Sequence, residues 1–426
     1  MSALPSVERT PGDGAGGHDA PLDAPLDAPL DVDGVRARIT AGALRDGPPG
    51  SVGLELERHA VDLRRPGRRV AWDRLDGALR GVVPPAGSRV TLEPGGQVEL
   101  SSPPLPGVAA AVEALRRDAA HVDAVLAADG VALLSTGTDL VRTPERVHPG
   151  SRYAAMAEHF AAAGHAADGA AMMCSTASLQ VNLDAGPAQR WPHRLAHLHR
   201  LLPALAALGA CSPLLAGRAD GTRSTRQGVW RRLEPGRCTR PAGGAGGTGA
   251  TDPAGAWAAF ALSAPVMLVR DGEHAPCRAV RGPVTLADWA SGRRPLHGRA
   301  PTGADVDLHL STLWPPVRVR GFLELRVLDA LPAAWWPGLT AVVATVVDDE
   351  RAADAAAAVV DGCGPDTARA ARGLLDAALP AVPAALRGCV EAWADLLDAG
   401  RHPADLVLDR ARRDGPAACL TAEELR

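Results

Sequence analysis

Charged residues spaced two apart recur within short apolar runs of this sequence. Glu324 and Arg326 alternate with leucine and valine, and Glu55 and Glu57 alternate with leucine. Successive side chains of a β-strand point to opposite faces, so each run predicts a strand with one buried apolar side and one charged side. These four residues are the starting point for a hypothesis about chemistry.

Two further segments place polar side chains in a comparable way. Glu93 and Glu99 flank Pro94-Gly95-Gly96, a sequence that predicts a hairpin or a tight bend between two short strands. Gln180 and Asn182 alternate with apolar residues near the end of residues 172–184, which we predict to be a strand. The bend would fold Glu99 back toward the strand that carries Glu93.

If these strands belong to one sheet, its polar face gathers several carboxylates. Carboxylates at close range repel each other unless a cation lies among them. Mg²⁺ prefers oxygen ligands and is commonly bound by a few carboxylates together with substrate phosphates. For any single segment the ordinary interpretation is a solvated sheet face, but the acids on several strands favour a metal–nucleotide site, with Arg326 contacting phosphate beside Glu324.

The composition excludes some classes of chemistry. The chain has 426 residues and no lysine, so all 45 basic residues other than histidine are arginine. A Schiff-base enzyme and a Walker A nucleotide loop both require lysine. The net charge of −4, with acids and arginines interspersed, argues against a nucleic-acid-binding surface.

The cysteines and the chain ends bear on location. The seven cysteines are scattered and form no CxxC pair, which is typical of reduced thiols in a cytoplasmic protein. No run is long and apolar enough to span a membrane, and the first residues lack the pattern of a signal peptide. None of the cysteines has a convincing histidine partner in the sequence, so we expect no cysteine nucleophile.

The domain organisation follows from composition and periodicity. Residues 1–33 are rich in Gly, Pro and Asp and are predicted to be disordered. Residues 34–426 are predicted to be a single catalytic domain whose last part, 335–426, is helical. Within it we expect helices over 35–44, 108–128, 151–163 and 191–210, a strand over 131–134, an arginine-dense loop over 212–232, and a Gly-rich surface loop over 241–255 that closes over a site.

Together, the motifs resemble those of a known family. They are Leu92-Glu-Pro-Gly-Gly-Gln-Val-Glu-Leu-Ser101, the stretch from Met172 to Asp184, Ser224-Thr-Arg226 with Trp230, and His309 to Arg326. In this order they are similar to the glutamate–cysteine ligases of the plant and proteobacterial type, and most similar to the actinobacterial branch that serves ergothioneine biosynthesis. The resemblance extends from about Val52 to Ala330.

The resemblance implies a fold and a reaction. The fold is α+β, with a curved, mainly antiparallel sheet flanked by helices, as in the glutamine synthetase and guanido kinase superfamily. ATP would phosphorylate the γ-carboxylate of L-glutamate, and the amine of L-cysteine would attack the acyl phosphate to give γ-glutamylcysteine, ADP and phosphate. The implied cofactors are ATP and Mg²⁺, and the implied protein is a cytoplasmic monomer that binds only small molecules, not nucleic acid or membranes.

The resemblance also assigns roles to individual residues. Arg326 would contact phosphate, and Arg226 would pair with the α-carboxylate of glutamate. Glu324, Arg326 and Arg226 are thus the candidate catalytic residues. The candidate metal ligands are Glu55, Glu57, Glu93, Glu99 and Glu324, and the candidate substrate-binding residues are Arg226, Arg237, Gln180, Asn182, Thr176 and His309.

One position departs from the plant-type pattern. Pro316 stands where the plant enzymes carry a glutamate, in Pro315-Pro316-Val317-Arg318, which removes one acid from the rim of the site. Three alternatives remain beside the ligase. They are a γ-glutamyl ligase for another amine, a small-molecule phosphotransferase of the same superfamily, and a non-catalytic homologue, which the presence of all the acids disfavours.

Overall fold

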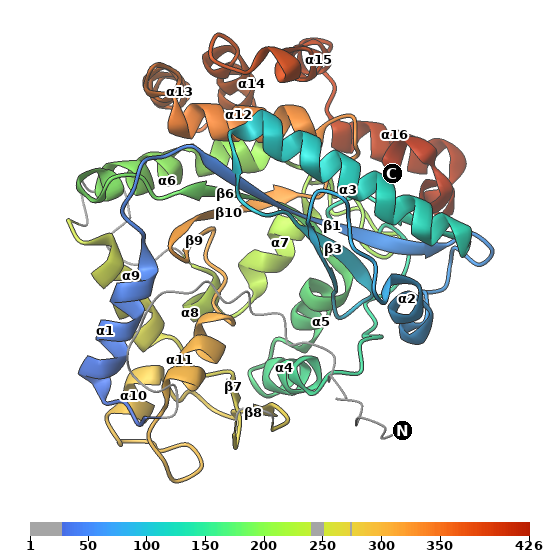
Figure 1. The fold of residues 1–426 in the computed structure, drawn as a ribbon. Helices are drawn as coiled ribbons and strands as arrows, with labels where there is room; N and C mark the ends of the chain where they lie inside the picture. Colours follow the sequence, from blue (N-terminus) through green and yellow to red (C-terminus); the bar gives the residue numbers. More distant parts are fainter. Residues whose placement is uncertain (1–27, 240–250, 273–274) are drawn as a thin grey trace, which may run out of the picture.

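The computed structural model describes residues 28–239, 251–272 and 275–426. Its centre is an antiparallel sheet with the strand order β2-β3-β1-β6-β10-β9, in which β4 and β5 also pair with β1 (Figure 1). The strands are β1 (Ser51–Asp62), β2 (Arg89–Leu92), β3 (Gln97–Ser101), β4 (Leu105–Pro106), β5 (Val131–Leu134), β6 (Ser178–Asp184), β9 (Val317–Val319) and β10 (Phe322–Asp329), and a separate ribbon joins β7 (Leu268–Val269) and β8 (Arg278–Ala279).

Helices cover the sheet and build the rest of the molecule. They are α1 (Val32–Ala43), α2 (Trp72–Leu79), α3 (Val108–Ala128), α4 (Ser151–Ala162), α5 (Ala166–Ser175), α6 (Trp191–Leu208), α7 (Thr225–Arg232), α8 (Pro235–Cys238), α9 (Pro253–Ser263), α10 (Leu286–Ala290), α11 (Gly303–Leu310), α12 (Trp336–Asp348), α13 (Glu350–Cys363), α14 (Thr367–Ala378), α15 (Ala384–Asp398) and α16 (Pro403–Asp414), with short 3₁₀ turns at Ala188–Arg190, Pro416–Thr421 and Glu423–Leu425. In the part of the chain that the structure describes, no helix has the length and apolar character needed to cross a bilayer.

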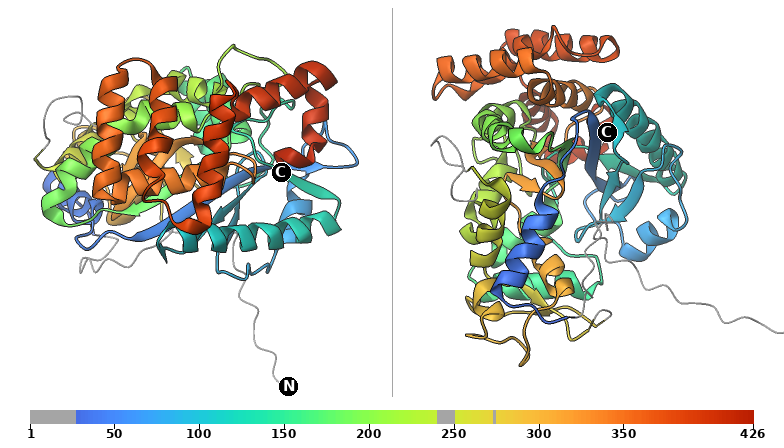
Figure 2. Two further views of the ribbon diagram at one scale, coloured as in Figure 1. Left: turned by 90° about the horizontal axis from the view of Figure 1, so that it is seen from above. Right: turned by 60° about the vertical axis from the view of Figure 1, so that its left-hand side comes forward.

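The alternation of each strand determines what covers the two faces of the sheet. The apolar face carries Leu54, Leu100, Val181 and Leu325, all of which are fully buried. It packs against α3, α6 and α12, and the helices α13–α15 form a further layer beyond these (Figures 1 and 2). The opposite, polar face looks toward the part of the molecule that contains α5, α7 and α8.

Several elements occur where the sequence pattern predicts them. The helices over 108–128 and 151–163 correspond to α3 and α4, and the strand over 131–134 is β5. Pro94-Gly95-Gly96 is the turn of the β2–β3 hairpin, in which Glu93 N donates to Gln97 O at 2.8 Å. Gly96 has a φ of +83°, a conformation that favours glycine.

The prediction of a strand over 172–184 was wrong in its first part. Residues up to Ser175 belong to α5, and the strand begins at Ser178. Met172 and Met173 are buried against the helical segment around Phe160, and this packing favours the helix. Thr176 ends α5 in an extended conformation, with its hydroxyl donating to Met172 O at 2.6 Å.

The arginine-dense segment is not entirely a loop. Residues 225–232 form α7, and the side chain of Ser224 caps this helix by accepting a hydrogen bond from Gln227 N at 3.2 Å. Serine before a helix is a recognised start signal, so the sequence contained the evidence for α7.

Two predicted irregular segments lie partly outside the described residues. Of the N-terminal 1–33, the residues up to 27 are not described, and α1 already begins at Val32 with Asp31 as its cap. Of the Gly-rich 241–255, residues 241–250 are not described, and α9 begins at Pro253 with Asp252 as its cap.

Candidate active site

The register of the sheet places the predicted acids side by side on the polar face. Glu57 of β1 lies opposite Glu99 of β3. Glu55 of β1 lies opposite Gln180 of β6, and Asn182 of β6 lies opposite Glu324 of β10. The expectation that these separate segments share one sheet face is therefore confirmed.

Glu55, Glu57 and Glu99 accept hydrogen bonds from uncharged donors. Asn182 Nδ2 donates to Glu55 Oε1 at 3.1 Å. Ser178 N and Gln180 Nε2 donate to Glu57 at 2.8 and 3.2 Å. Glu99 accepts from the hydroxyls of Thr91 and Ser101 at 3.0 and 2.8 Å. These carboxylates are fixed in place without neutralisation of their charge.

The electrostatics of this acidic group follow from burial. Burial, together with Glu324 and Glu99 nearby, raises the pKa of Glu55 to about 7. Burial raises the pKa of Glu57, Glu93 and Glu99 as well, with further contributions from the neighbouring carboxylates. Their charged forms are costly in the protein alone, so a cation among them would be strongly favoured.

Glu324 is held in a different way. It is fully buried, and both of its oxygens accept hydrogen bonds from the guanidinium of Arg318, with Nη2 to Oε1 at 2.8 Å. Arg326 Nη1 also donates to Oε1, at 3.1 Å. Although burial alone would raise the pKa of Glu324, Arg318 and Arg326 lower it to about 2.

These contacts suggest a second role for Glu324, beside the metal binding that stays a prediction. Three hydrogen bonds from Arg318 and Arg326 reach the two carboxylate oxygens of Glu324, so arginine neutralises its charge in this structure. We infer that it orients the two arginines, with Arg320 a third cation whose Nη1 lies 3.9 Å away. The polar face thus has a positive end at β9 and β10 beside an acidic region on β1, β3 and the β2–β3 turn.

The acidic region fits Mg²⁺ in its donor chemistry. Glu55, Glu57, Glu93 and Glu99 supply carboxylate oxygens, and the buried Oδ1 of Asn182 has no hydrogen-bond partner. Within the described ranges, no three acidic, histidine or cysteine side chains converge closely enough to enclose an ion by themselves. A magnesium ion here would therefore take one or two carboxylates and complete its shell with phosphate and water, as Mg²⁺ commonly does.

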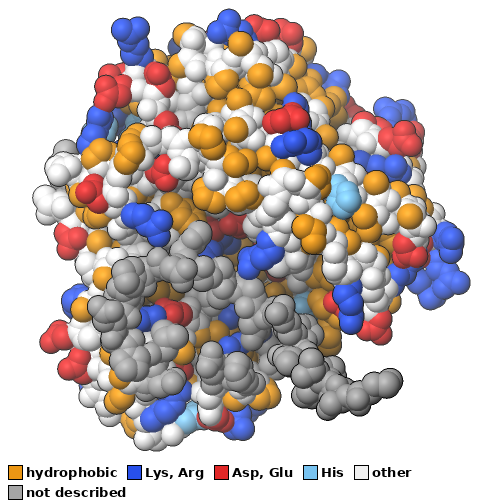
Figure 3. Space-filling model, in the orientation of Figure 1, with side chains coloured by type: hydrophobic (Ala, Val, Ile, Leu, Met, Phe, Trp, Pro, Cys, Tyr) orange, Lys and Arg blue, Asp and Glu red, His pale blue; other side chains and the backbone are white. Residues whose placement is uncertain are grey.

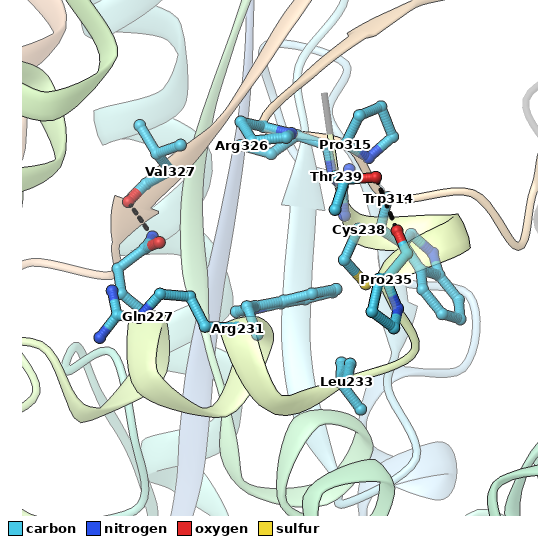
Figure 4. Close-up of a pocket in the computed structure, with 12 residues that line it drawn as sticks. Gln227, Arg231, Leu233, Pro235, Cys238, Thr239, Trp314, Pro315, Arg326 and Val327 are labelled. Carbon is cyan, nitrogen blue, oxygen red and sulfur yellow. Dashed lines mark hydrogen bonds between the residues drawn. The ribbon is translucent and has the colours of Figure 1, made fainter. Parts of the chain in front are cut away.

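A cavity of about 220 Å³ opens next to the positive end of this face. Trp230, Leu233 and Trp314 supply much of its apolar wall, and Arg326 reaches it from β10 (Figure 4). The two indole rings meet edge to face, with centroids 5.9 Å apart. Arg326 therefore borders both the carboxylates and the cavity.

On the surface, the view in Figure 3 shows acidic, basic and apolar side chains interspersed, with no large field of one charge. This agrees with the net charge of −4 spread along the chain. The charges that matter for chemistry are therefore the buried ones on the polar face of the sheet.

Comparison with known proteins identifies the family. The model of glutamate–cysteine ligase family 2 matches residues 51–418. The chain belongs to the glutamate–cysteine ligase family. It is 46% identical over 398 residues to glutamate–cysteine ligase EgtA of Mycolicibacterium smegmatis, covering 90% of this chain and 92% of that one. Identity to the chloroplastic glutamate–cysteine ligase of Medicago truncatula is 30%, over 58% of this chain and 49% of the plant protein.

The solved structures agree at the level of the fold. The chain superposes on the glutamate–cysteine ligase of Francisella tularensis, solved in complex with AMP, with a TM-score of 0.50 at 12% identity, covering 88% of this chain and 87% of that one. This similarity confirms the predicted α+β class with a mainly antiparallel sheet.

In this ligase, Arg226 is buried with Nε and Nη1 lacking a hydrogen-bond partner, and its pairing with the α-carboxylate of glutamate stays a prediction. It is 2% exposed and does not line the cavity. Its guanidinium lies beneath β10, where Nη2 donates to the backbone oxygen of Arg326 at 3.1 Å and Nη1 lies 3.6 Å from Asp329. The arginines that line the cavity are Arg231 of α7 and Arg326 of β10.

Three other predicted substrate contacts are buried within the protein. Arg237 is fully buried and donates to Glu234, Thr312 and the backbone oxygen of Pro265. His309 Nε2 bonds to Ala261 O at 2.8 Å, and the hydroxyl of Thr176 is occupied in capping α5. These contacts join neighbouring helices and loops, and a direct role in substrate binding stays a prediction for Arg237, His309 and Thr176.

Gln180 and Asn182 do lie on the polar face. The amide of Gln180 bridges the acidic and positive regions, because its nitrogen donates to Glu57 and its oxygen accepts from Arg326. Asn182 lies two residues further along β6, and its Oδ1 has no hydrogen-bond partner. A contact between these amides and a substrate stays a prediction.

Sequence reasoning missed three residues that build the site. Arg318 of β9 and Arg320, directly after the end of β9, converge on Glu324, and their spacing of two was itself a strand signal. Asp329 is fully buried and paired with Arg226, but a lone aspartate near the end of an apolar strand carries no local sign of that role.

Proposed function

We propose that this protein joins the γ-carboxylate of L-glutamate to the amine of L-cysteine at the expense of ATP, through γ-glutamyl phosphate. The supporting observation is the position of Arg326. Glu324 and Gln180 fix its guanidinium at the boundary between a group of unneutralised carboxylates and a cavity. A positively charged group held between a metal site and a small-molecule site is what phosphoryl transfer requires.

The chemistry divides between the two regions of the polar face. Mg²⁺, bound by residues among Glu55, Glu57, Glu93 and Glu99, would neutralise charge on the phosphates of ATP. Arg326 would contact the transferring phosphoryl group from the other side, with Arg320 nearby. Because Arg326 is already oriented by Glu324 and Gln180, little reorganisation would be needed when the phosphoryl group arrives.

The reaction needs no covalent bond to the protein. A γ-carboxylate oxygen of glutamate attacks the terminal phosphorus of ATP, and ADP leaves. The amine of cysteine then attacks the acyl carbon, phosphate leaves, and the nitrogen loses its proton to solvent. We propose that the amino-acid substrates approach from the cavity beside Arg326, whose walls of Trp230, Trp314 and Leu233 exclude water from the acyl phosphate.

The place of the product is also a proposal. The similarity to the two mycobacterial ligases named EgtA, at 46% and 43% identity, supports a role in supplying γ-glutamylcysteine for ergothioneine biosynthesis. A cytoplasmic, monomeric enzyme is the form that we expect.

A coupled assay of ADP release tests the proposal. Purified protein with ATP, Mg²⁺ and L-glutamate should release ADP rapidly only when L-cysteine is added, and mass spectrometry should show γ-glutamylcysteine. Faster turnover with a different amine would indicate another γ-glutamyl ligase. ADP release with glutamate alone and no peptide product would indicate a phosphotransferase.

A further inference from the structure

The strand that carries Arg326 is interrupted at that residue. β10 pairs with β6 through Leu325 opposite Val181, and pairing resumes at Leu328 opposite Leu179. Arg326 and Val327 together therefore oppose the single residue Gln180. This is the geometry of a β-bulge, which locally twists a strand and redirects a side chain.

The backbone groups released by the bulge are bonded to neighbouring segments. Arg326 N donates to Pro316 O at 3.0 Å. Arg226 Nη2 donates to Arg326 O at 3.1 Å, and Gln227 Nε2 donates to Val327 O at 2.6 Å (Figure 4). The first turn of α7 thus holds the bulge from below.

Asp329 fixes the start of α7 in turn. Its carboxylate is fully buried and accepts hydrogen bonds from Cys211 N at 2.8 Å, Ser212 Oγ at 2.6 Å and Ser224 Oγ at 3.1 Å. Ser224 is the N-cap of α7, and Ser212 Oγ accepts a hydrogen bond from Arg226 N. The carboxylate of Asp329 therefore fixes the start of α7 both directly, through Ser224, and indirectly, through Ser212 and the backbone of Arg226.

Asp329 also supplies the counter-charge of Arg226. Among the described residues it is the one carboxylate within ion-pair distance of that guanidinium. Arg226 is buried close to a second cation, Arg326, and a buried charge without a partner is strongly unfavourable. Loss of the charge on Asp329 would therefore displace Arg226 and release the bulge.

The space around Asp329 is closely fitted. A methyl group added to Gly137 would lie 2.4 Å from Asp329 Cγ, well inside van der Waals contact. The backbone of Gly137 thus forms a wall against the carboxylate, which limits its freedom to move.

From these contacts we propose that Asp329 is a positioning residue for phosphoryl transfer. It acts through Arg226 and the bulge to aim the side chain of Arg326 at Glu324 and Gln180. Asp329 is not among the residues that line the cavity. The inference rests on the proposed function only in taking Arg326 to be a phosphate contact.

A double-mutant cycle tests the proposal. Wild type, D329N, R326K and the double variant are compared by kcat for ADP release and by Kd for ATP from calorimetry. We expect D329N to lower kcat ten- to a hundredfold, because a displacement of about 1 Å at a catalytic group can cost about a hundredfold in rate. In the R326K background, D329N should lower kcat and weaken ATP binding by less than threefold further, because the group that it positions is already changed.

Two results would overturn the proposal. One is a D329N enzyme with kcat within twofold of wild type. The other is an equal loss on introducing D329N with and without R326K. If R326K turns over too slowly to measure, the same comparison of the four proteins is made with the Kd for ATP in place of kcat.

Asp305 offers a matched control. It is 5% exposed and paired with Arg299, away from the sheet face. D305N should lower the melting temperature and leave kcat unchanged. If D329N does not fold, S212A removes one hydrogen bond to the same carboxylate and replaces D329N in the cycle.

The proposed function and the positioning role are tested by different measurements. The product formed by the wild type tests the proposed function. The ratios of rates between variants test the positioning role, in whichever ATP-consuming reaction the wild type catalyses.

Discussion

Glu324→Gln tests whether Glu324 orients arginines or binds metal. The substitution keeps the size of the side chain and removes its charge. Arg318 and Arg326, both bonded to this carboxylate, would then lose their shared anion in a region where Glu324 itself is fully buried. The structure predicts lower stability and lower turnover with little change in the requirement for Mg²⁺.

The expected loss of stability can be worked out in two ways. A pKa of about 2 for Glu324, against about 4.3 for a free glutamate, corresponds to about 3 kcal/mol in favour of the charged form. Removing one partner of a buried ion pair generally costs about 3 to 5 kcal/mol. Because the pKa is lowered, this stabilisation is complete at pH 7 and is lost only as the pH falls toward 2. Urea denaturation at pH 7 should therefore show a loss of about 3 kcal/mol.

Glu57→Gln is the matched control on the same sheet face. Burial raises the pKa of Glu57, so its charge is unfavourable in the folded protein without metal, and neutralising it should leave stability unchanged or increase it. The same chemical substitution is thus predicted to have different effects at two acids on neighbouring parts of the sheet.

The activity assay separates the two roles further. For Glu324→Gln we expect kcat for ADP release to fall at least about a hundredfold, with the Mg²⁺ concentration at half-maximal rate within twofold of wild type. For Glu57→Gln we expect that Mg²⁺ concentration to rise at least about fivefold. A Glu324→Gln enzyme of normal stability that needs much more Mg²⁺ would refute the reasoning and support Glu324 as a metal ligand.

Three further predictions concern other parts of the site and core. Arg326→Lys should lower kcat at least about a hundredfold, because an ammonium cannot bond Glu324 and Gln180 and still present a planar donor pair to phosphate; near-normal kcat would contradict this. Gly95→Ala should lower the melting temperature and raise the Mg²⁺ requirement, because the added methyl would lie 2.1 Å from Cys174 O, whereas Gly42→Ala, with nothing within 4 Å, should change neither. His309→Gln should flatten the pH dependence of stability. Burial and the nearby Arg237 lower the pKa of His309 to about 3, so the wild type should lose about 2 kcal/mol more than the variant in urea denaturation between pH 7 and pH 5, and parallel curves would argue against a neutral buried histidine.

Much of the sheet could be predicted because strand periodicity is local. The alternation around Glu55, Glu57 and Glu324 placed these acids on one side of each strand, and the Pro-Gly-Gly turn joined Glu93 to Glu99. Errors arose where tertiary packing overrides local pattern. The two methionines that precede Thr176 lie in a helix because they pack against a buried cluster around Phe160, and no alternation could reveal that.

The sequence alone determined the family, the strands and the chemical types at the site, because residue identity and spacing carry that information. The absence of lysine by itself left arginine, backbone N–H groups and metal as the groups that can hold phosphate. The polar face could be anticipated for a similar reason, since a period of two assigns every side chain of a strand to a face.

Only the tertiary structure decided how the charges pair. Glu324 takes Arg318 and Arg326, Glu57 takes neutral donors, and Arg226 lies beneath a bulge beside Asp329 rather than in the cavity. Charge pairing depends on distances of a few ångströms between segments far apart in the chain, and burial decides whether a carboxylate is stabilised or strained. Neither the distances between segments nor the burial of a side chain is determined by the local sequence. Glutamate therefore binds arginines at one end of the sheet and has the donor chemistry for a cation at the other.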